Sequence, residues 1–562
     1  MSESRSLRAG PLQATFAGGE LRHIRFGSSE VVQRIYGTVR DRNWATTPGL
    51  LENVSIHAGT REFQIVFDSL HQQGEVNFGW RGTIIGTESG SISFTMDGKA
   101  NSTFRRNRIG LCVYHPLREC RGKPCVVEVA DGALERTQFP EFVSPHQPFL
   151  NVRAIRYEIA PGIRAEVRFN GDVFETEDHR NWTDANFKTY GTPLHLPFPV
   201  EMIAGAEIHQ SIEVTLQSAP KSTESSRERV VQVRIADPLG LRLPRIGLGI
   251  ASDGRALSKA DREMLSRLRL NHLRVDVALC SDALPALELA AAEAKAIGAK
   301  LEAAVTLPGD TKGLKDFMPI VVRWLIYDQN EKATGANAAR ELRAVLGSEA
   351  FLVVGSNAYF AELNRNRPEG DGWNAACFSV NPQVHTFDDE SVMQNTSAQF
   401  DAVRSALRFL GGRPVVVSPV TLRPRFNPNV IGVVEPPQPD PRQKLPFCAA
   451  WTVASLKALA EAGASSVTYF ETHGAGGVLD GREAYPVFRV LEAVGEFAGA
   501  HVIACESSDD SRVAALGLEF GGRRRMLIAN LTGELCEIDL AGSSETMHLE
   551  PYAVSRLDSG SA

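Results

Sequence analysis

Eight short apolar runs alternate with helix-like stretches between about residues 243 and 498, and this alternation constrains the fold more than any other feature. The runs are rich in Val, Ile and Leu, as buried parallel strands are. Between them, Leu, Ala and Val recur at the three- and four-residue spacing of amphipathic helices. Eight such units in one series predict a closed (β/α)8 TIM-like barrel over residues 236–499. A doubly wound open sheet is the competing interpretation, but it would normally show a glycine-rich loop at its switch point.

The regions on either side of the barrel are predicted to be all-β. Residues 1–235 contain about ten segments that alternate apolar and polar residues and are separated by Gly, Asn and Asp, which predicts a β-sandwich. Residues 500–562 contain only short strand-like segments and are expected to form a small β-domain. The chain is therefore predicted to combine a multidomain α/β architecture with all-β parts.

Composition excludes several classes of partner. A net charge of −7 and a pI near 6.1 argue against nucleic acid or an anionic membrane surface. No apolar run reaches the roughly 18 residues that span a bilayer, and the amino-terminal residues lack a secretory-type apolar region. The eight cysteines are scattered, without the paired spacing of a zinc site. We therefore expect reduced thiols, a cytoplasmic location, and neither a cofactor nor a transition metal.

Residues 174–191, FETEDHRNWTDANFKTYG, combine many ionisable groups with three aromatic residues. Burying that many charges unpaired would be costly, whereas a solvated loop would rarely contain three aromatics. The combination suits a segment that lines a polar pocket and binds a hydroxylated ligand. A salt-bridged surface turn is the alternative. The substrate-binding candidates here are Asp178, Arg180, Asn181, Asp184 and Lys188.

In a barrel, the reactive groups come from the carboxyl ends of the strands and the loops that follow. Glu471 emerges from an apolar run into a glycine-rich turn, and His385 follows another run, so both are candidates for proton transfer. The alternatives are a carboxylate that only holds an arginine and a packed histidine. From the polar residues at the strand ends, those chosen as site candidates are Arg274, Asp276, Asp328, Glu331, Asn357, His385, Glu471 and His473. Arg274 and Asp276 share one face of a strand, so an interior ion pair is an equally good interpretation of them.

The run predicted as strand seven, PVVVSPVTLRPR, contains no acidic residue. A retaining glycosidase needs two carboxylates, and in the large barrel clan the nucleophile stands at that position. Glu331 follows Asn330 on strand four, as in the acid/base position of that clan, but Glu471 comes one strand too late for the nucleophile. This departure argues against a two-glutamate mechanism.

Several stretches resemble the D-apionolactonase (D-apionate lactonase) family. The most specific is GDVFETEDHRNWTDANFKTYGTPL at 171–194. Shorter matches are IYGTVRDRNW at 35–44, NRIGLCVYHP at 107–116, FPEFVSPHQPF at 139–149, NPQVHTFDD at 381–389 and LEPYAVSRLD at 549–558. The resemblance covers nearly the whole chain. It implies hydrolysis of D-apionolactone to D-apionate, a cytoplasmic step of apiose catabolism.

Lactone hydrolysis needs a base for water, donors for the oxyanion and an acid for the departing ring oxygen. We expect Glu471 to be the base and His385 or His473 the acid. Oxyanion donors would come from Arg274, or from Arg180 or Lys188 of the first domain. Two other functions remain open at this point: a glycoside hydrolase that uses Glu331 and Glu471, and a carbohydrate-binding protein without catalytic activity.

Overall fold

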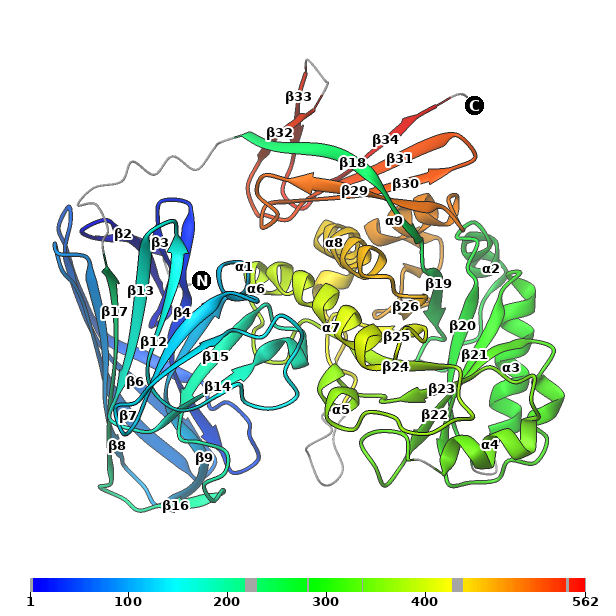
Figure 1. Cartoon of the computed structure of the whole chain (residues 1–562). Helices are drawn as coiled ribbons and strands as arrows, with labels where there is room; N and C mark the ends of the chain where they lie inside the picture. Colours follow the sequence, from blue (N-terminus) through cyan, green and yellow to red (C-terminus); the bar gives the residue numbers. More distant parts are fainter. Residues whose placement is uncertain are drawn as a thin grey trace. The chain divides into compact units, whose positions relative to one another are not determined.

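The computed structural model describes residues 4–217, 230–279, 283–335, 337–426, 438–541 and 545–560 (Figure 1). The chain divides into two compact units. The first comprises Met1–His179 and Asn186–Glu228, and the second comprises Arg180–Ala185 and Arg229–Ala562. Six residues that interrupt the first unit in sequence therefore belong to the second. They come from the segment that combines aromatic and charged side chains.

The first unit is built from strands, with one short helix, α1 (Leu117–Cys120), in its described part. Alternating burial along most strands, such as BiBiB in β2, reflects the alternation of apolar and polar residues in the sequence. The strands are β1 (Arg5–Ala9), β2 (Leu12–Ala17), β3 (Glu20–Phe26), β4 (Ser29–Asp41), β5 (Gly49–Ala58), β6 (Phe63–Gln73), β7 (Val76–Gly86), β8 (Ser91–Ala100), β9 (Phe104–Pro116), β10 (Pro124–Val129), β11 (Leu134–Gln138), β12 (Phe149–Ala160), β13 (Ile163–Asn170), β14 (Phe174–Asp178), β15 (Asn186–Gly191), β16 (Val200–Met202) and β17 (Glu207–Gln217). A 3₁₀ turn, η1 (His179–Trp182), follows β14.

Hydrogen bonds join these 17 strands into one continuous sheet, whereas we expected the two separate sheets of a sandwich. Long strands make the connection, because different parts of one strand pair with different neighbours. β9 pairs with β4 on one edge, and on the other with β16 near Arg105 and with β15 near Val113. The sequence pattern identifies each strand but does not contain these pairings.

The second unit contains a closed barrel of eight parallel strands, as predicted. Its strands are β19 (Arg245–Gly249), β20 (His272–Ala278), β21 (Lys300–Leu307), β22 (Val321–Asp328), β23 (Leu352–Gly355), β24 (Ala375–Val380), β25 (Val415–Val420) and β26 (Ser466–Glu471). Pairing of β19 with both β20 and β26 closes the ring. Each strand lies within or overlaps one of the eight apolar runs, so the strand count from the sequence is correct. β25 is therefore strand seven, and it carries no acidic residue.

Helices connect the barrel strands. They are α2 (Lys259–Ser266), α3 (Ala283–Ala296), α4 (Ala338–Leu346), α5 (Phe360–Arg365), α6 (Asp389–Gln394), α7 (Thr396–Phe409), α8 (Pro446–Ala462) and α9 (Pro486–Gly495), with turns η2 (Leu314–Phe317) and η3 (Pro441–Lys444) and a small hairpin of β27 (Leu479–Asp480) and β28 (Glu483–Ala484). A capping box starts α2: Ser258 Oγ accepts from the Asp261 N–H at 3.1 Å, and the Asp261 carboxylate accepts from the Ser258 N–H at 2.8 Å. Among the described residues, no helix is long and apolar enough to cross a membrane.

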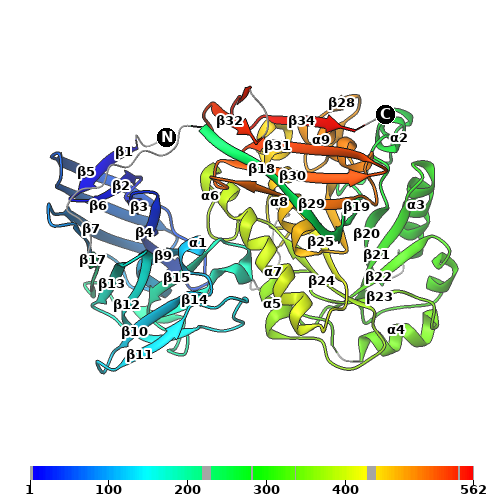
Figure 2. The ribbon, with the colours of Figure 1, turned by 45° about the horizontal axis from the view of Figure 1, so that its top comes forward.

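A seven-stranded sheet packs against α8 (Figure 2). Its order is β33–β32–β18–β29–β30–β31–β34, with β18 (Val230–Arg242), β29 (His501–Ser507), β30 (Val513–Phe520), β31 (Arg523–Asn530), β32 (Cys536–Leu540), β33 (Thr546–Leu549) and β34 (Val554–Ser559). Because this sheet covers α8 on the side away from the barrel, 13 of the helix's 17 residues are buried, which explains a sequence that is apolar on nearly every face.

The position of β18 differs from our expectation. We placed residues 230–235 in the first domain, but β18 pairs in parallel with β32 and antiparallel with β29. Val231 and Val233 are buried in the core of the C-terminal sheet. The alternating pattern of this segment predicts a strand with one buried face, and it does not identify the sheet that the strand joins.

Candidate active site

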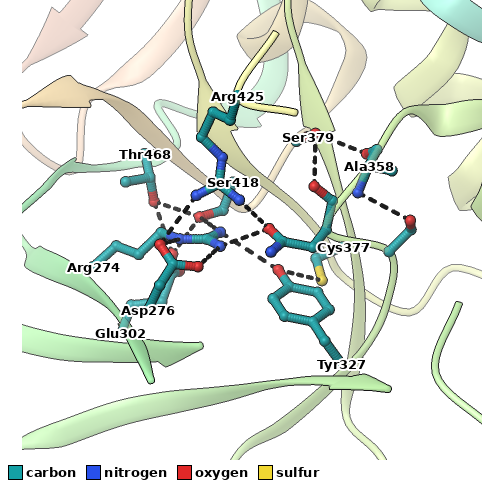
Figure 3. Close-up of polar contacts among 12 residues, drawn as sticks. Arg274, Asp276, Glu302, Tyr327, Ala358, Cys377, Ser379, Ser418, Arg425 and Thr468 are labelled. Atoms are coloured by element: carbon teal, nitrogen blue, oxygen red, sulfur yellow. Dashed lines mark hydrogen bonds and ion pairs between the residues drawn. The ribbon is translucent and has the colours of Figure 1, made fainter. Parts of the chain in front are cut away.

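Arg274 lies at the centre of a polar cluster inside the barrel (Figure 3). Alternation along β20 places Arg274 and Asp276 on the same inner face. The buried guanidinium donates from Nη1 to Ser418 Oγ at 2.9 Å and from Nη2 to Asn357 Oδ1 at 2.8 Å. Ser418 belongs to β25 and Asn357 follows β23, so side chains from three strands meet at this point.

Asp276 lies between two arginines. Its Oδ1 accepts from Arg274 Nη2 at 2.6 Å, and its Oδ2 accepts from Arg425 Nη1 at 3.0 Å. Although burial opposes ionisation, the two guanidiniums hold the pKa of Asp276 well below its ordinary value. The Arg274 side chain is 1% exposed and that of Asp276 is 49% exposed, so the carboxylate faces open space at the barrel mouth. Asn357 Oδ1 also accepts from Arg425, which keeps the two guanidiniums side by side.

Below this pair, Glu302 of β21 lies in the barrel interior with no exposed surface. Its Oε1 accepts from Ser418 Oγ and from Thr468 Oγ1, the latter at 2.9 Å. Its Oε2 lies 3.1 Å from Nε of Arg323. Burial raises the pKa of Glu302, but the basic groups around it more than offset this and hold the pKa below its ordinary value. Two ionised carboxylates, Asp276 and Glu302, thus face three arginines, which leaves the interior with an excess of positive charge.

Cys377 of β24 lies at the edge of the same cluster. Its Sγ is 3.6 Å from the hydroxyl of Tyr327, which in turn lies 3.4 Å from Arg274 Nη1. Burial raises the pKa of Cys377 to about 12. A thiol that stays protonated at neutral pH is a poor nucleophile. The cluster therefore suits attack by water better than attack by this sulfur.

Glu471 ends β26 at a break in the strand. Phe470 has φ of 45°, a left-handed conformation that a bulky residue rarely adopts, and the pairing with β19 shifts register here. Gly249 allows this irregularity, because a Cβ at that position would lie 2.9 Å from the Phe470 carbonyl oxygen. The bulge redirects the following side chain, and Glu471 Oε2 accepts from the Ser252 N–H at 3.1 Å.

Strand register gives the spacing between Glu471 and Arg274. Gly249 of β19 pairs with Arg274 on one side and with Glu471 on the other. Adjacent strands lie about 4.8 Å apart, so the two backbones are about 10 Å apart across the rim. Glu471 and Arg274 therefore belong to the same part of the rim, two strands apart.

The two predicted histidines differ in their surroundings. His473 is 1% exposed, and its Nε2 lies 3.5 Å from Asp253 in the loop that follows β19. His385 is partly exposed, and its Nδ1 lies 2.7 Å from Asp184 Oδ2. Its ring also meets Trp182 edge-to-face, with centroids 5.6 Å apart. Only His385 therefore combines a carboxylate partner with partial exposure.

Residues 180–185 are fixed to the second unit by buried polar contacts. Arg180 Nη1 donates to Asp401 Oδ2 at 2.8 Å, with both side chains buried. The other contacts run from Asn364 Nδ2 to Asn181 Oδ1 at 3.1 Å, from Thr183 Oγ1 to Asn381 O at 2.9 Å, from the Ala185 N–H to Asn395 Oδ1 at 2.9 Å, and from Asn395 Nδ2 to Asp184 Oδ1 at 3.2 Å. Their partners lie in α5, in α7 and in the segment after β24. These residues thus form part of the wall around His385.

Among the predicted site residues, Asp276 and Asn357 are joined to Arg274 by hydrogen bonds of the described chain, and four others lie in neither this cluster nor the surroundings of Glu471 and His385. Asp178 and Lys188 belong to the first unit, where Asp178 accepts from the Ser144 N–H at 2.9 Å and Lys188 lies 3.3 Å from Glu177. Asp328 accepts from the Asn330 N–H at 2.9 Å, and Glu331 is exposed. The glycosidase pair of Glu331 and Glu471 gains no support from these positions.

Sequence reasoning missed Arg425, Glu302 and Tyr327. Glu302 could have been found, because it is a lone acid in an otherwise apolar strand, KLEAAVTL. Arg425 follows strand seven by five residues, and nothing in the loop sequence shows that it folds back over Asp276. Tyr327 is a usual residue for a buried strand and gives no signal.

The fold and the cluster define the class first: a multidomain protein with a TIM barrel that holds charged and polar side chains at its mouth. Three family models then match the chain, namely the D-apionate lactonase N-terminal domain over residues 1–219, its TIM barrel domain over 331–499 and its C-terminal immunoglobulin-like domain over 510–557. The chain belongs to the D-apionate lactonase family. It is therefore a lactonase, a carboxylic ester hydrolase, as the resemblance implied.

A D-apionate lactonase from Brucella anthropi is 28% identical, over 98% of this chain and 96% of that protein. Among solved structures, an endoxylanase of glycoside hydrolase family 30 from Clostridium papyrosolvens has a TM-score of 0.42 and 10% identity, over 59% of this chain and all of that one. A β-arabinopyranosidase has a TM-score of 0.27 and 9% identity, over 99% of this chain and 98% of that one. Likenesses this distant carry no argument about function.

Proposed function

We propose that the protein hydrolyses the five-membered lactone D-apionolactone to D-apionate in cytoplasmic apiose catabolism. A relative with the corresponding name matches 98% of the chain, which supports the substrate. Free, buried cysteines in the described part of the chain support a reducing compartment. The observation that carries the proposal is the arrangement of Arg425 and Arg274 around the half-exposed Asp276, with Glu471 two strands away.

Arg425 is the donor best placed for the oxyanion of the tetrahedral intermediate. Its Nη1 and Nη2 already donate to Asp276 and Asn357. Its Nε is buried and has no hydrogen-bond partner among the described residues. The Arg425 side chain is nevertheless 28% exposed, so a substrate oxygen can approach the guanidinium from the barrel mouth. A fixed cationic donor also stabilises the negative charge that forms as water adds to the lactone carbonyl.

Glu471 acts as the base in this proposal. It removes a proton from water as the oxygen attacks the carbonyl carbon. Its carboxylate is held by the Ser252 N–H, and its backbone is about 10 Å from that of Arg274, which places both residues at the same part of the rim. Asp276 stays ionised between the two arginines and fixes their orientation.

His385 supplies the proton that the ring oxygen needs when the acyl C–O bond breaks. It follows β24, the strand between those that lead to Asn357 and Arg425, so it approaches the same part of the rim. Asp184 accepts from its Nδ1, which orients the ring and stabilises a protonated imidazole. Water contributes OH to the acyl carbon and H to the alkoxide. Glu471 ends this step protonated and His385 neutral, and both return to their starting states by proton exchange with solvent, while the product acid ionises and releases the proton that the assay measures.

The test is proton release by the purified full-length protein with D-apionolactone, a panel of aldonolactones and an aryl glycoside, against spontaneous lactone opening. We expect the highest kcat/KM with D-apionolactone. Arg425→Gln should lower kcat by about 10²–10³-fold. Arg423→Gln is the matched control, because Arg423 is two residues away, 40% exposed and paired with Asp440 instead. No acceleration with any lactone, or equal activity of the two variants, would refute the proposal.

A further inference from the structure

A cavity of about 900 Å³ lies at the opposite end of the barrel from the proposed active site. Its wall includes residues at the start of strands or just before them: Arg245 of β19, Asn271 before β20, Lys300 of β21, Phe351 before β23 and Ser465 before β26. In a parallel barrel, the amino ends of all strands lie on one side. The cavity is therefore distinct from the site around Asp276. Its volume is within the range of ordinary ligand pockets.

The charges around this cavity have one sign. Its basic lining residues are Arg242, Arg245, Arg269, Lys300 and Arg323, and no Asp or Glu is among the described residues that line it. The chain as a whole carries a net charge of −7, so this concentration of positive charge runs against its overall composition. A concave wall lined by cations concentrates the field and attracts anions.

Three of these cations have no carboxylate to balance them. Arg323 Nε lies 3.1 Å from Glu302 Oε2. Arg269 is one of the arginines that, against the effect of burial, hold the pKa of Glu496 below its ordinary value. Arg242 instead donates to the Gly499 carbonyl at 2.8 Å, and Lys300 to the Pro319 carbonyl at 3.2 Å. Within the described chain, no acidic side chain lies at ion-pair distance from Arg242, Arg245 or Lys300.

We propose that this cavity binds a small, multiply charged anion, such as a phosphorylated or polycarboxylate metabolite. Guanidinium groups recognise phosphate and carboxylate through paired N–H donors, and Lys300 adds a mobile point charge. Three unbalanced cations suit two or three negative charges better than the single charge of a sugar acid. The inference does not depend on the lactonase mechanism, because none of its residues takes part in that proposal.

Isothermal titration of the full-length protein with pyrophosphate, and separately with citrate, tests the site. We expect saturable binding of one anion per chain that weakens as salt is raised; the tighter ligand identifies phosphate or carboxylate chemistry. The double variant Arg245→Gln/Lys300→Gln should bind at least about tenfold more weakly. Both residues are exposed, so the fold should be preserved, and unchanged lactonase activity checks this.

The matched control is Arg404→Gln/Lys259→Gln, which removes the same two charge types from exposed helix positions outside the cavity. It should bind like the wild type. If neither anion gives saturable binding to the wild type, or if both double variants bind equally, the proposed site does not exist.

Discussion

Replacing Asp276 by asparagine tests whether the two arginines at the barrel mouth depend on the carboxylate between them. The carboxylate accepts three hydrogen bonds: 2.6 Å from Arg274 Nη2, 3.2 Å from Arg274 Nε and 3.0 Å from Arg425 Nη1. An amide has one oxygen, so its NH₂ group must face a guanidinium in either orientation. Asp276→Asn therefore breaks at least one charged hydrogen bond. It also places the amide N–H donors opposite the N–H donors of an arginine.

The magnitude follows from the geometry and the exposure. A hydrogen bond to a charged group contributes about 1.5–3 kcal/mol. Because 49% of the Asp276 side chain is exposed, solvent screening reduces this, and we expect a loss of about 1–2 kcal/mol in the free energy of unfolding. For the second unit, with its 340 residues, that corresponds to a decrease of roughly 1–3 °C in Tm.

The dependence on pH gives a second readout. The folded protein lowers the pKa of Asp276, so its contribution is complete above the unfolded value of about 3.9 and is lost as pH falls towards the folded pKa. The Tm difference between wild type and Asp276→Asn should be constant from about pH 8 to pH 5 and narrow below about pH 4. Asp328→Asn is the control, since Asp328 accepts a backbone N–H and no arginine. Equal Tm values for the two variants at pH 7, or a difference that grows in acid, would refute the reasoning.

Three further outcomes are expected. Glu471→Gln should lower kcat by about 10²–10⁴-fold with little change in Tm, measured by proton release, because the amide can keep its backbone contact but cannot accept a proton; an unchanged kcat would exclude this base. Asp184→Asn and His385→Gln should each lower kcat, and the double variant should lose no more than the worse single one, since the pair acts as a unit; additive losses would contradict that. Gly249→Ala should also lower kcat, because its methyl group would lie 2.9 Å from the Phe470 carbonyl oxygen and displace the bulge before Glu471. Wild-type kinetics with an unchanged circular dichroism spectrum would show that the bulge is not needed for catalysis.

The barrel could be predicted from the sequence because its signal is local. Runs such as Val321–Asp328 and Val415–Val420 are apolar enough to be buried on both faces, and helix-like segments separate them. Eight such runs in one series indicate a closed barrel of eight strands, which the structure contains. Pairing is not local, so the same reasoning assigned Val230–Arg242 to the wrong sheet: alternation shows that one face is buried and leaves the partner undetermined.

The candidate site could be predicted only where a strand imposes it. Arg274 and Asp276 are two residues apart on one strand, which places both on the inner face, and the ion pair between them follows from that spacing. Arg425 lies in a loop, where tertiary contacts and not periodicity decide the position. The aromatic and charged segment around Trp182 illustrates the same limit: its composition indicated a pocket wall, but the sequence could not show that only residues 180–185 belong to the barrel unit while Asp178 and Lys188 do not.

A chain of buried hydrogen bonds runs through the barrel interior from its amino end to its mouth. Arg323 at the amino end donates to His272 Nδ1 at 3.0 Å, and the His272 Nε2 therefore donates to Thr468 Oγ1 at 2.8 Å. Burial lowers the pKa of His272 to about 3, so this ring is neutral. It accepts a hydrogen bond at Nδ1 and donates one at Nε2. Thr468 donates to Glu302, which also accepts from the serine that contacts the arginine of the mouth. Arg323 and Glu302 compensate each other in this column, so removing either one leaves the other unpaired at a cost of several kcal/mol. An apolar barrel core would be simpler to stabilise. The buried charged groups instead hold the Arg274 guanidinium rigid at the barrel mouth, where the proposed reaction develops negative charge.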